Sequence, residues 1–334
     1  MLNNKSILIT GGTGSFGQAI IEFIIKNYPK YKRLVIFSRD ENKQFEMQKK
    51  YPAAKYPNLR FFIGDIRDYK RLRTALNRID FVFHAAAIKQ LPVSEYNPSE
   101  AIKTNIDGAQ NLIDASLEEN VQKVIFLSTD KACSPVNLYG ATKLCAEKLF
   151  LTAKKTNPYK STKFLIMRYG NVNASRGSVM PFFIERSKSK ILPVTHKDMT
   201  RFSIKMNEAI DMSMWALKYM EDGQILIPKI PSYRVLDLAK VFKGSKIKFV
   251  GIRQGEKVHE DLISKAESRF AMETKKYFIL YPNVSPKKFE KYRKKIKAST
   301  QIKEFNYNSG NNSNFLNSKQ LLSIINEIKK NNQI

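Results

Sequence analysis

The sequence predicts an α/β protein built on a doubly wound parallel sheet, with a smaller C-terminal lobe. Three observations support this class. Short apolar runs alternate with helical patterns through the first half, a glycine-rich turn follows the first run, and the alternation stops after residue 171. Strands that alternate regularly with helices form parallel sheets, which the helices cover on both faces.

Six short runs rich in β-branched and aromatic residues predict the buried strands of this sheet. They lie at residues 7–9, 34–37, 59–63, 81–83, 124–127 and 164–167. Between them, apolar residues recur at helical spacing. These intervals predict helices around residues 20–25, 72–76, 101–118 and 139–153.

The second half follows a different pattern. Residues 225–227 and 247–250 resemble isolated strands, and residues 236–242 a short helix. The basic run 287–297 predicts a solvated helix or loop, residues 306–314 predict a loop, and residues 321–328 a final amphipathic helix. We expect one domain over residues 1–171, and a smaller lobe that takes up most of 172–334 and is interleaved with the first domain.

The glycine-rich turn carries a glycine at every third position, Gly11, Gly14 and Gly17, between the first strand and the first helix. Gly11 allows a tight turn, Gly14 a close approach to a pyrophosphate, and Gly17 close packing of the helix. The helix N-terminus that follows favours phosphate groups. This context predicts a Rossmann-type dinucleotide site. Its expected contacts are Gly11, Thr13, Gly14, Ser15, Phe16 and Gly17.

The end of the second strand favours NADP over NAD. Ser38 and Arg39 come first, and Lys43 follows one helical turn later. A cation here suits a 2′-phosphate, although Arg39 as a surface charge with Asp40 as the ribose ligand is the alternative. Asp65, after the third strand, is expected near the adenine amino group, or else as a helix cap. The remaining expected cofactor contacts are Ile66, Ala85, Ala86, Val172, Tyr139 and Lys143.

A catalytic pattern follows the fifth strand. Thr129 lies at the strand end, and Tyr139 and Lys143 are four residues apart, on one face of the predicted helix. A neighbouring lysine cation favours the phenolate, so Tyr139 is expected to act as the base for an alcohol that gives up a hydride. Together with the glycine loop, this pattern resembles the extended short-chain dehydrogenase/reductase superfamily, whose members mostly convert nucleotide-linked sugars.

Asp130 and Lys131 directly follow Thr129. A sugar 4,6-dehydration needs a base for the C5 proton and an acid for the departing 6-hydroxyl, and a plain epimerase needs neither. Asp130 and Lys131 stand where those groups would be required. The alternative is a solvent-exposed Asp–Lys pair in a loop.

Residues 129–143 are similar to the inverting UDP-N-acetylglucosamine 4,6-dehydratases of the pseudaminic acid pathway. Agreeing blocks lie at residues 11–17, 37–41, 84–89, 95–98, 103–106, 168–172, 175–183, 199–202, 227–231 and 255–257. The resemblance implies an NADP-dependent lyase of flagellin glycosylation, with UDP-sugar as substrate. It also implies a homo-oligomer, a dimer or hexamer, and a cofactor that is regenerated in each cycle and stays bound.

The resemblance also implies a role for each residue. Tyr139 takes the 4-hydroxyl proton, Thr129 hydrogen-bonds that hydroxyl, and Lys143 holds the nicotinamide ribose and lowers the pKa of Tyr139. Lys131 is the expected base at C5, and Asp130 the expected acid for the 6-hydroxyl. Lys131 implies inversion at C5, since the retaining enzymes carry glutamate there. Expected UDP-sugar contacts are Lys89, Asn171, Arg201 and Arg253.

Several residues depart from the family pattern, and they leave the sugar open. They are Gln90, Ser134, Asn173, Ala174, Ser203 and Phe315. One alternative is a dehydratase or epimerase for another UDP-HexNAc. Another is a non-catalytic, dinucleotide-sensing regulator, which would not need all five catalytic residues.

Charge, cysteine content and missing motifs argue against nucleic-acid-binding, metal-binding and membrane proteins. A net charge of +28 would suit nucleic acid or an anionic membrane surface, but zinc-finger, basic-zipper and RNA-binding motifs are absent from the sequence. Part of the charge suits a cleft for an anionic substrate. Two cysteines form neither a disulfide framework nor a metal site, and the sequence contains neither a signal peptide nor a long apolar run. We expect a cytoplasmic protein without metal, membrane or nucleic-acid partner.

Overall fold

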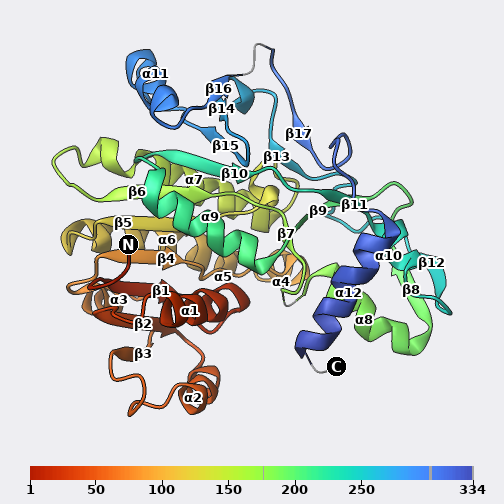
Figure 1. Cartoon of the computed structure of the whole chain (residues 1–334), viewed down its shortest axis with the longest axis horizontal. Helices are drawn as coiled ribbons and strands as arrows, with labels where there is room; N and C mark the ends of the chain where they lie inside the picture. The colour runs from red at the N-terminus through yellow and green to blue at the C-terminus, as the bar shows by residue number, and fades with distance from the viewer. Residues whose placement is uncertain (176, 301–302, 333–334) are drawn as a thin grey trace.

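The computed structural model describes residues 1–175, 177–300 and 303–332, and in them a ten-stranded sheet crosses the molecule (Figure 1). Its order is β16-β14-β15-β10-β6-β5-β4-β1-β2-β3. The parallel strands are β1 (Ser6–Thr10), β2 (Arg33–Ser38), β3 (Leu59–Ile63), β4 (Phe81–His84), β5 (Lys123–Leu127), β6 (Lys163–Met167) and β10 (Gln224–Pro228). The antiparallel strands are β14 (Ala271–Glu273), β15 (Tyr277–Leu280) and β16 (Ser299–Thr300).

The predicted strands of the first half are all confirmed. β1 is buried along its whole length, as expected of a strand covered by helices on both faces. In Figure 1, helices α1 and α9 lie in front of the sheet, and α6 and α7 lie behind it. The helices of this unit are α1 (Ser15–Asn27), α2 (Glu41–Lys50), α3 (Tyr69–Leu76), α4 (Leu91–Tyr96), α5 (Pro98–Ile102), α6 (Gly108–Glu118), α7 (Leu138–Thr156) and α9 (Met206–Tyr219).

The predicted helix at residues 101–118 is interrupted. Between α5 and α6 lies a π-helical turn, η1 (Lys103–Asp107). Asn105 in this turn accepts a hydrogen bond from the Ile88 backbone N–H at 2.9 Å, and it donates to the Ile88 carbonyl at 2.9 Å and to Thr142 Oγ1 at 3.0 Å. The wider turn therefore joins the segment after β4 to helix α7.

The strands predicted at 225–227 and 247–250 are confirmed as strands, but neither is isolated, and the loop predicted at 306–314 contains one short strand. The segment 225–227 belongs to β10, which extends the main sheet beside β6. The segment 247–250 contributes to β12 (Lys246–Phe249), which pairs with β8 (Ile191–Val194). The predicted loop 306–314 contains β17 (Tyr307–Asn308), which pairs with β13 (Asp261–Ile263).

A second unit packs beside the carboxyl ends of the parallel strands, on the right in Figure 1. Its apolar core includes Phe183, Tyr233 and Leu321. It contains β7 (Asn171–Val172), β9 (Thr200–Ile204), β11 (Ser232–Arg234), β8 and β12, with helices α8 (Val179–Arg186), α10 (Val235–Lys240) and α12 (Ser318–Asn332). The basic run after residue 286 forms helix α11 (Pro286–Lys295), near β14–β16 at the top of Figure 1.

Arg168, just after β6, connects helix α7 to the segment that contains β13 and Glu267 through a largely buried ion network. Its guanidinium donates to both carboxylate oxygens of Glu147 on α7, at 3.0 and 2.6 Å, and to Glu267 at 3.0 and 2.8 Å. A further bond of 3.0 Å reaches the Leu262 carbonyl in β13. Arg168 is 0% exposed, so all of its charge is compensated inside the protein.

Arg168→Met should lower the free energy of unfolding by roughly 3–5 kcal/mol, because it leaves the buried Glu147 and the partly exposed Glu267 without their cation. Urea unfolding followed by circular dichroism measures this change. Arg73→Met is the matched control, at an exposed arginine that pairs with Glu118 and Glu119, and it should leave the midpoint unchanged. Equal midpoints for Arg168→Met and the wild type would contradict the structural role of the network.

Candidate active site

A cavity of about 1300 Å³ lies between the carboxyl ends of the parallel strands and the second unit. In open α/β sheets this is where ligands bind. With the exception of Asp65, every residue predicted to contact cofactor or substrate lines it. These residues are Gly11, Thr13, Gly14, Ser15, Phe16, Gly17, Ser38, Arg39, Lys43, Ile66, Ala85, Ala86, Lys89, Thr129, Asp130, Lys131, Tyr139, Lys143, Asn171, Val172, Arg201 and Arg253.

The glycine loop forms a cradle that side chains would fill. Gly11 has φ +65°, and a Cβ there would lie 2.8 Å from the Ala86 backbone nitrogen. A Cβ on Gly17 would lie 2.6 Å from the Gly11 carbonyl oxygen. Helix α1 begins at Ser15 without a side-chain cap or an acidic residue in its first turn. Its N-terminal end therefore fits a pyrophosphate.

The end of β2 presents cations to the same cavity. The side chain of Arg39 is 52% exposed and lies 3.5 Å from Asp65 Oδ2. Asp40 caps helix α2 by accepting from the Lys43 backbone N–H at 2.9 Å, and its carboxylate also pairs with the Lys43 ammonium. Asp40 is thus engaged with its own helix, which argues against the alternative of Asp40 as the ribose ligand.

Asp65 is bound to arginine and lies outside the cavity wall. Its carboxylate accepts from the Arg67 backbone N–H at 2.9 Å and from the Arg67 guanidinium at 2.7 to 3.1 Å. The cap of α3 is Asp68, which accepts from the Arg71 N–H at 2.9 Å. The helix-cap alternative for Asp65 is therefore wrong, and this geometry does not support the predicted adenine contact.

Thr129, Asp130 and Lys131 lie close together on a short 3₁₀ turn, η2 (Asp130–Ala132), after β5. Asp130 Oδ1 accepts from Thr129 Oγ1 at 2.9 Å and from Lys131 Nζ at 3.1 Å. Asp130 is 1% exposed, so the alternative of a solvent-exposed Asp–Lys pair is wrong. A Cβ on Gly140 would lie 2.2 Å from the Lys131 carbonyl oxygen, and this closeness brings helix α7 against the turn.

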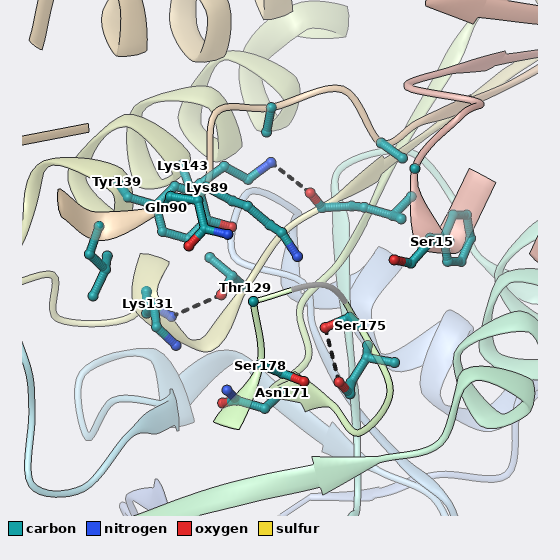
Figure 2. A pocket seen from close by; sticks show the side chains of 18 of the residues that line it. Ser15, Lys89, Gln90, Thr129, Lys131, Tyr139, Lys143, Asn171, Ser175 and Ser178 are labelled. Carbon is teal, nitrogen blue, oxygen red and sulfur yellow. Dashed lines mark hydrogen bonds between the residues drawn. The ribbon is translucent and has the colours of Figure 1, made fainter. Parts of the chain in front are cut away.

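Tyr139 lies with this cluster on one side of the cavity, and Ser15 of the glycine loop lies on the other (Figure 2). Burial raises the pKa of Tyr139 to about 12, while the charge of Lys131 and a hydrogen bond with Thr129 act to lower it. A phenolate at neutral pH therefore requires the neighbouring cation to be present when the substrate gives up its proton.

Lys143 occupies a different environment from the one predicted. Its ammonium donates to the Leu127 carbonyl at 2.7 Å and lies 3.9 Å from the centre of the Phe126 ring. Burial lowers the pKa of Lys143 to about 7, against the opposing charge of Glu147. In this structure the Lys143 ammonium is directed at Leu127, and the charge that acts to lower the pKa of Tyr139 is that of Lys131, so the role of Lys143 towards Tyr139 stays a prediction.

The second unit contributes the polar groups opposite this cluster. Asn171 is on β7 and Arg201 is on β9, where the Arg201 guanidinium also donates to the Thr200 carbonyl at 2.7 Å. The side chain of Arg253 is 58% exposed at the rim and faces Glu256. The sequence did not predict Glu260, which lines the same wall between Lys131 and Arg201. It belongs to none of the motifs, so only the fold could reveal it.

Comparisons with known proteins agree with this geometry. A family model described as "polysaccharide biosynthesis protein" matches residues 7–282. The chain belongs to this family. It is 46% identical, over 98% of both chains, to the UDP-N-acetylglucosamine 4,6-dehydratase (inverting) of Campylobacter jejuni. The resemblance predicted from the motifs is thereby confirmed.

Other members of the polysaccharide biosynthesis protein family and its fold carry different names. The UDP-glucose 4-epimerase of Rickettsia bellii is 43% identical over 83% of both chains. The crystal structure of Pen from Bacillus thuringiensis is 37% identical and covers 98% of this chain and 99% of its own, with a TM-score of 0.87. DesIV of Streptomyces venezuelae, a dTDP-glucose 4,6-dehydratase solved with NAD bound, covers 87% of this chain and 97% of its own. It shares the fold at 19% identity and a TM-score of 0.69.

The lowered pKa of Lys143 predicts how stability depends on pH. As pH falls from 10.5 towards 7, this lysine takes up a proton in the unfolded chain but not in the folded one, so the folded state loses stability. Lys143→Met removes this loss. Between pH 10.5 and pH 7 the wild type should therefore lose more unfolding free energy than the variant.

Urea unfolding at a series of pH values measures this difference. Lys148→Met changes an exposed lysine on the same helix and should follow the wild type. Parallel curves for Lys143→Met and the wild type would show that the Lys143 ammonium is not destabilised by burial.

Proposed function

We propose that the protein is an NADP-dependent 4,6-dehydratase that converts UDP-N-acetylglucosamine to a UDP-4-keto-6-deoxy-HexNAc with inversion at C5. The observation that carries this proposal is the pairing of Lys131 with the buried Asp130 beside Tyr139 on the cavity wall. The relationship to the Campylobacter dehydratase supports it, because that protein is named for this reaction and is matched over nearly its full length.

The Asp130–Lys131 pair also favours dehydration over the epimerisation for which the Rickettsia relative is named. Epimerisation at C4 requires hydride removal and return, but no acid for a departing hydroxyl. In the described part of the chain, Asp130 Oδ2 is buried without a hydrogen-bond partner. An unpartnered buried oxygen is costly unless a ligand completes it, and a substrate hydroxyl would do so. An inert sensor has no need of such an arrangement.

The chain's own residues account for each proton transfer. Tyr139 takes the proton of the 4-hydroxyl, which Thr129 holds by a hydrogen bond. When bound, NADP supplies a hydride acceptor for C4 and a donor for C6, and is unchanged after the cycle. Lys131, in its neutral form, takes the C5 proton, which is acidic beside the C4 ketone. Asp130 first takes the ammonium proton of Lys131 across their 3.1 Å contact, which leaves Lys131 neutral. Asp130 then gives this proton to the departing 6-hydroxyl, so that water leaves, and reprotonation of C5 on the opposite face inverts it.

NADP rather than NAD is supported by the cations at the end of β2. Arg39 lies at the cavity wall, and Asp40 is taken up by capping α2 and by pairing with Lys43. The glycine cradle fits the pyrophosphate that both cofactors share. Tight binding of NADP is compatible with the reaction, since a cofactor that is regenerated in every cycle need not dissociate between cycles.

The lobe within residues 172–334 is proposed to bind the UDP-sugar through Arg201 and Arg253, because arginine suits a diphosphate. We further propose a homo-oligomer, a dimer or hexamer, formed through helices α4, α5 and α7. Large apolar side chains are exposed on α4 and α5, including Val93 at 48%, Tyr96 at 87% and Ile102 at 40%. We also propose that the protein is cytoplasmic, where its two free thiols, Cys133 and Cys145, would stay reduced.

Purified protein incubated with UDP-N-acetylglucosamine in D₂O should give a 4-keto-6-deoxy product that carries deuterium at C5 with inverted configuration. Proton NMR of the product measures both. Lys131→Ala should keep its cofactor but give no product, because the C5 proton then has no base. If the wild type dehydrated no UDP-HexNAc, the proposed dehydratase activity would be refuted. An active Lys131→Ala would refute the assignment of Lys131 as the C5 base.

Arg39→Ala should weaken NADPH binding by about tenfold or more, through loss of a charge-assisted contact, and leave NADH binding unchanged. Isothermal titration calorimetry on protein freed of its cofactor measures both affinities. Lys49→Ala, at an exposed lysine that pairs with Glu46 on the helix α2 that follows Arg39, is the control and should change neither. Wild-type protein that binds NADH more tightly than NADPH would overturn the cofactor assignment.

A further inference from the structure

Glu260 lies directly before β13 and is 2% exposed on the cavity wall. Its Oε1 lies 3.4 Å from Lys131 Nζ and 3.7 Å from Arg201 Nε. In the described part of the chain, its second oxygen, Oε2, is buried without a hydrogen-bond partner. Glu260 is therefore a buried carboxylate placed between the proposed base and the proposed diphosphate-binding arginine.

The late loop of the chain holds Glu260 in place. The Glu260 N–H donates to Ser309 Oγ at 2.9 Å, and the Ser309 N–H donates to the Glu260 carbonyl at 2.8 Å. Ser309 is fully buried, and its hydroxyl bonds Thr200 Oγ1 at 2.7 Å. Thr200 Oγ1 also contacts Nδ1 of His259, the residue before Glu260, at 2.8 Å. These bonds fix the backbone from which the Glu260 carboxylate extends.

The charges that face Lys131 come from several elements. Asp130 on η2 and Glu260 are the anions, Arg201 on β9 is a cation, and the phenols of Tyr139 on α7 and Tyr233 on β11 complete the surroundings. Burial acts to lower the pKa of Lys131, but Asp130 and then Glu260 raise it above its ordinary value, with Arg201 opposing them. Two carboxylates thus face one ammonium.

We propose that Glu260 is a positioning residue that fixes the Lys131 ammonium between two carboxylates and holds it protonated in the substrate-free cavity. The consequence of this positioning for catalysis rests on the proposed function. A lysine accepts the C5 proton only in its neutral form, so a carboxylate that favours the charged form sets how much base is present at a given pH. Glu260 then determines how far dehydration is suppressed at low pH.

Acetylation of the substrate-free protein by acetic anhydride tests the charge of Lys131 directly, because only the neutral amine attacks the anhydride and releases acetate. Glu260→Gln should speed acetylation of Lys131 about tenfold at pH 8, corresponding to a pKa lowered by about one unit when the carboxylate is removed. Peptide mass spectrometry measures the rate at each lysine. Lys143, in the same cavity, serves as the internal reference, and its rate should not change.

Asp261→Asn is the matched control, because Asp261 is the next residue, pairs with Lys257 at 3.4 Å, and does not line the cavity. It should leave the Lys131 rate unchanged. Should Glu260→Gln not fold, Glu260→Asp retracts the carboxylate by one methylene and should give an intermediate rate. An unchanged Lys131 rate, an equal increase at Lys143, or an equal effect of Asp261→Asn would each overturn the proposal.

The pH profile of dehydration gives the functional readout. In Glu260→Gln the decline of kcat/KM towards low pH should begin about one pH unit lower than in the wild type. A merely structural role would lower kcat/KM at every pH without displacing the profile. Acetylation needs no turnover, so a wild type that makes no keto sugar refutes the proposed function alone. If the wild type makes the keto sugar but Glu260→Gln leaves the rate of Lys131 acetylation unchanged, only the proposed role of Glu260 is refuted.

Discussion

The buried charge of Arg168 is the constraint on which the arrangement of the cavity depends. A guanidinium without solvent must find all of its partners inside the protein, and here they come from α7, β13 and the turn that contains Glu267. Helix α7 carries Tyr139 and Lys143, and β13 begins just after Glu260. Arg168 therefore helps to hold together the two walls on which the proposed proton transfers depend.

The parts of the fold that the sequence predicted well are those with local signals. Buried strands, the glycine turn and the Tyr139–Lys143 spacing each depend on residues within a few positions of one another. The features that sequence reasoning missed depend on distant partners. β10 is a sheet strand because β6 lies beside it, Asn105 is placed by a π-helical turn, and Glu260 meets Lys131 through the fold alone.

Composition alone could not distinguish the two buried lysines of the site, although their environments give them opposite behaviour. Lys143 contacts a carbonyl and an aromatic ring, so burial prevails and its pKa falls to about 7. Lys131 lies between Asp130 and Glu260, so the anions prevail and its pKa rises. Of the net charge of +28, such residues account for a small part, and the remaining surplus has no structural explanation.

The cavity also suggests how one fold can support both epimerisation and dehydration of nucleotide sugars. Hydride exchange at C4 would use the glycine cradle and Tyr139. The proposed elimination would add Asp130 as acid and Lys131 as base on a single 3₁₀ turn, which packs against helix α7 where Gly140 leaves room for the Lys131 carbonyl. A buried base of this kind requires counter-charges, and Glu260 meets that need from the other unit. The proposed dehydration therefore depends on both units for its charges as well as for substrate binding.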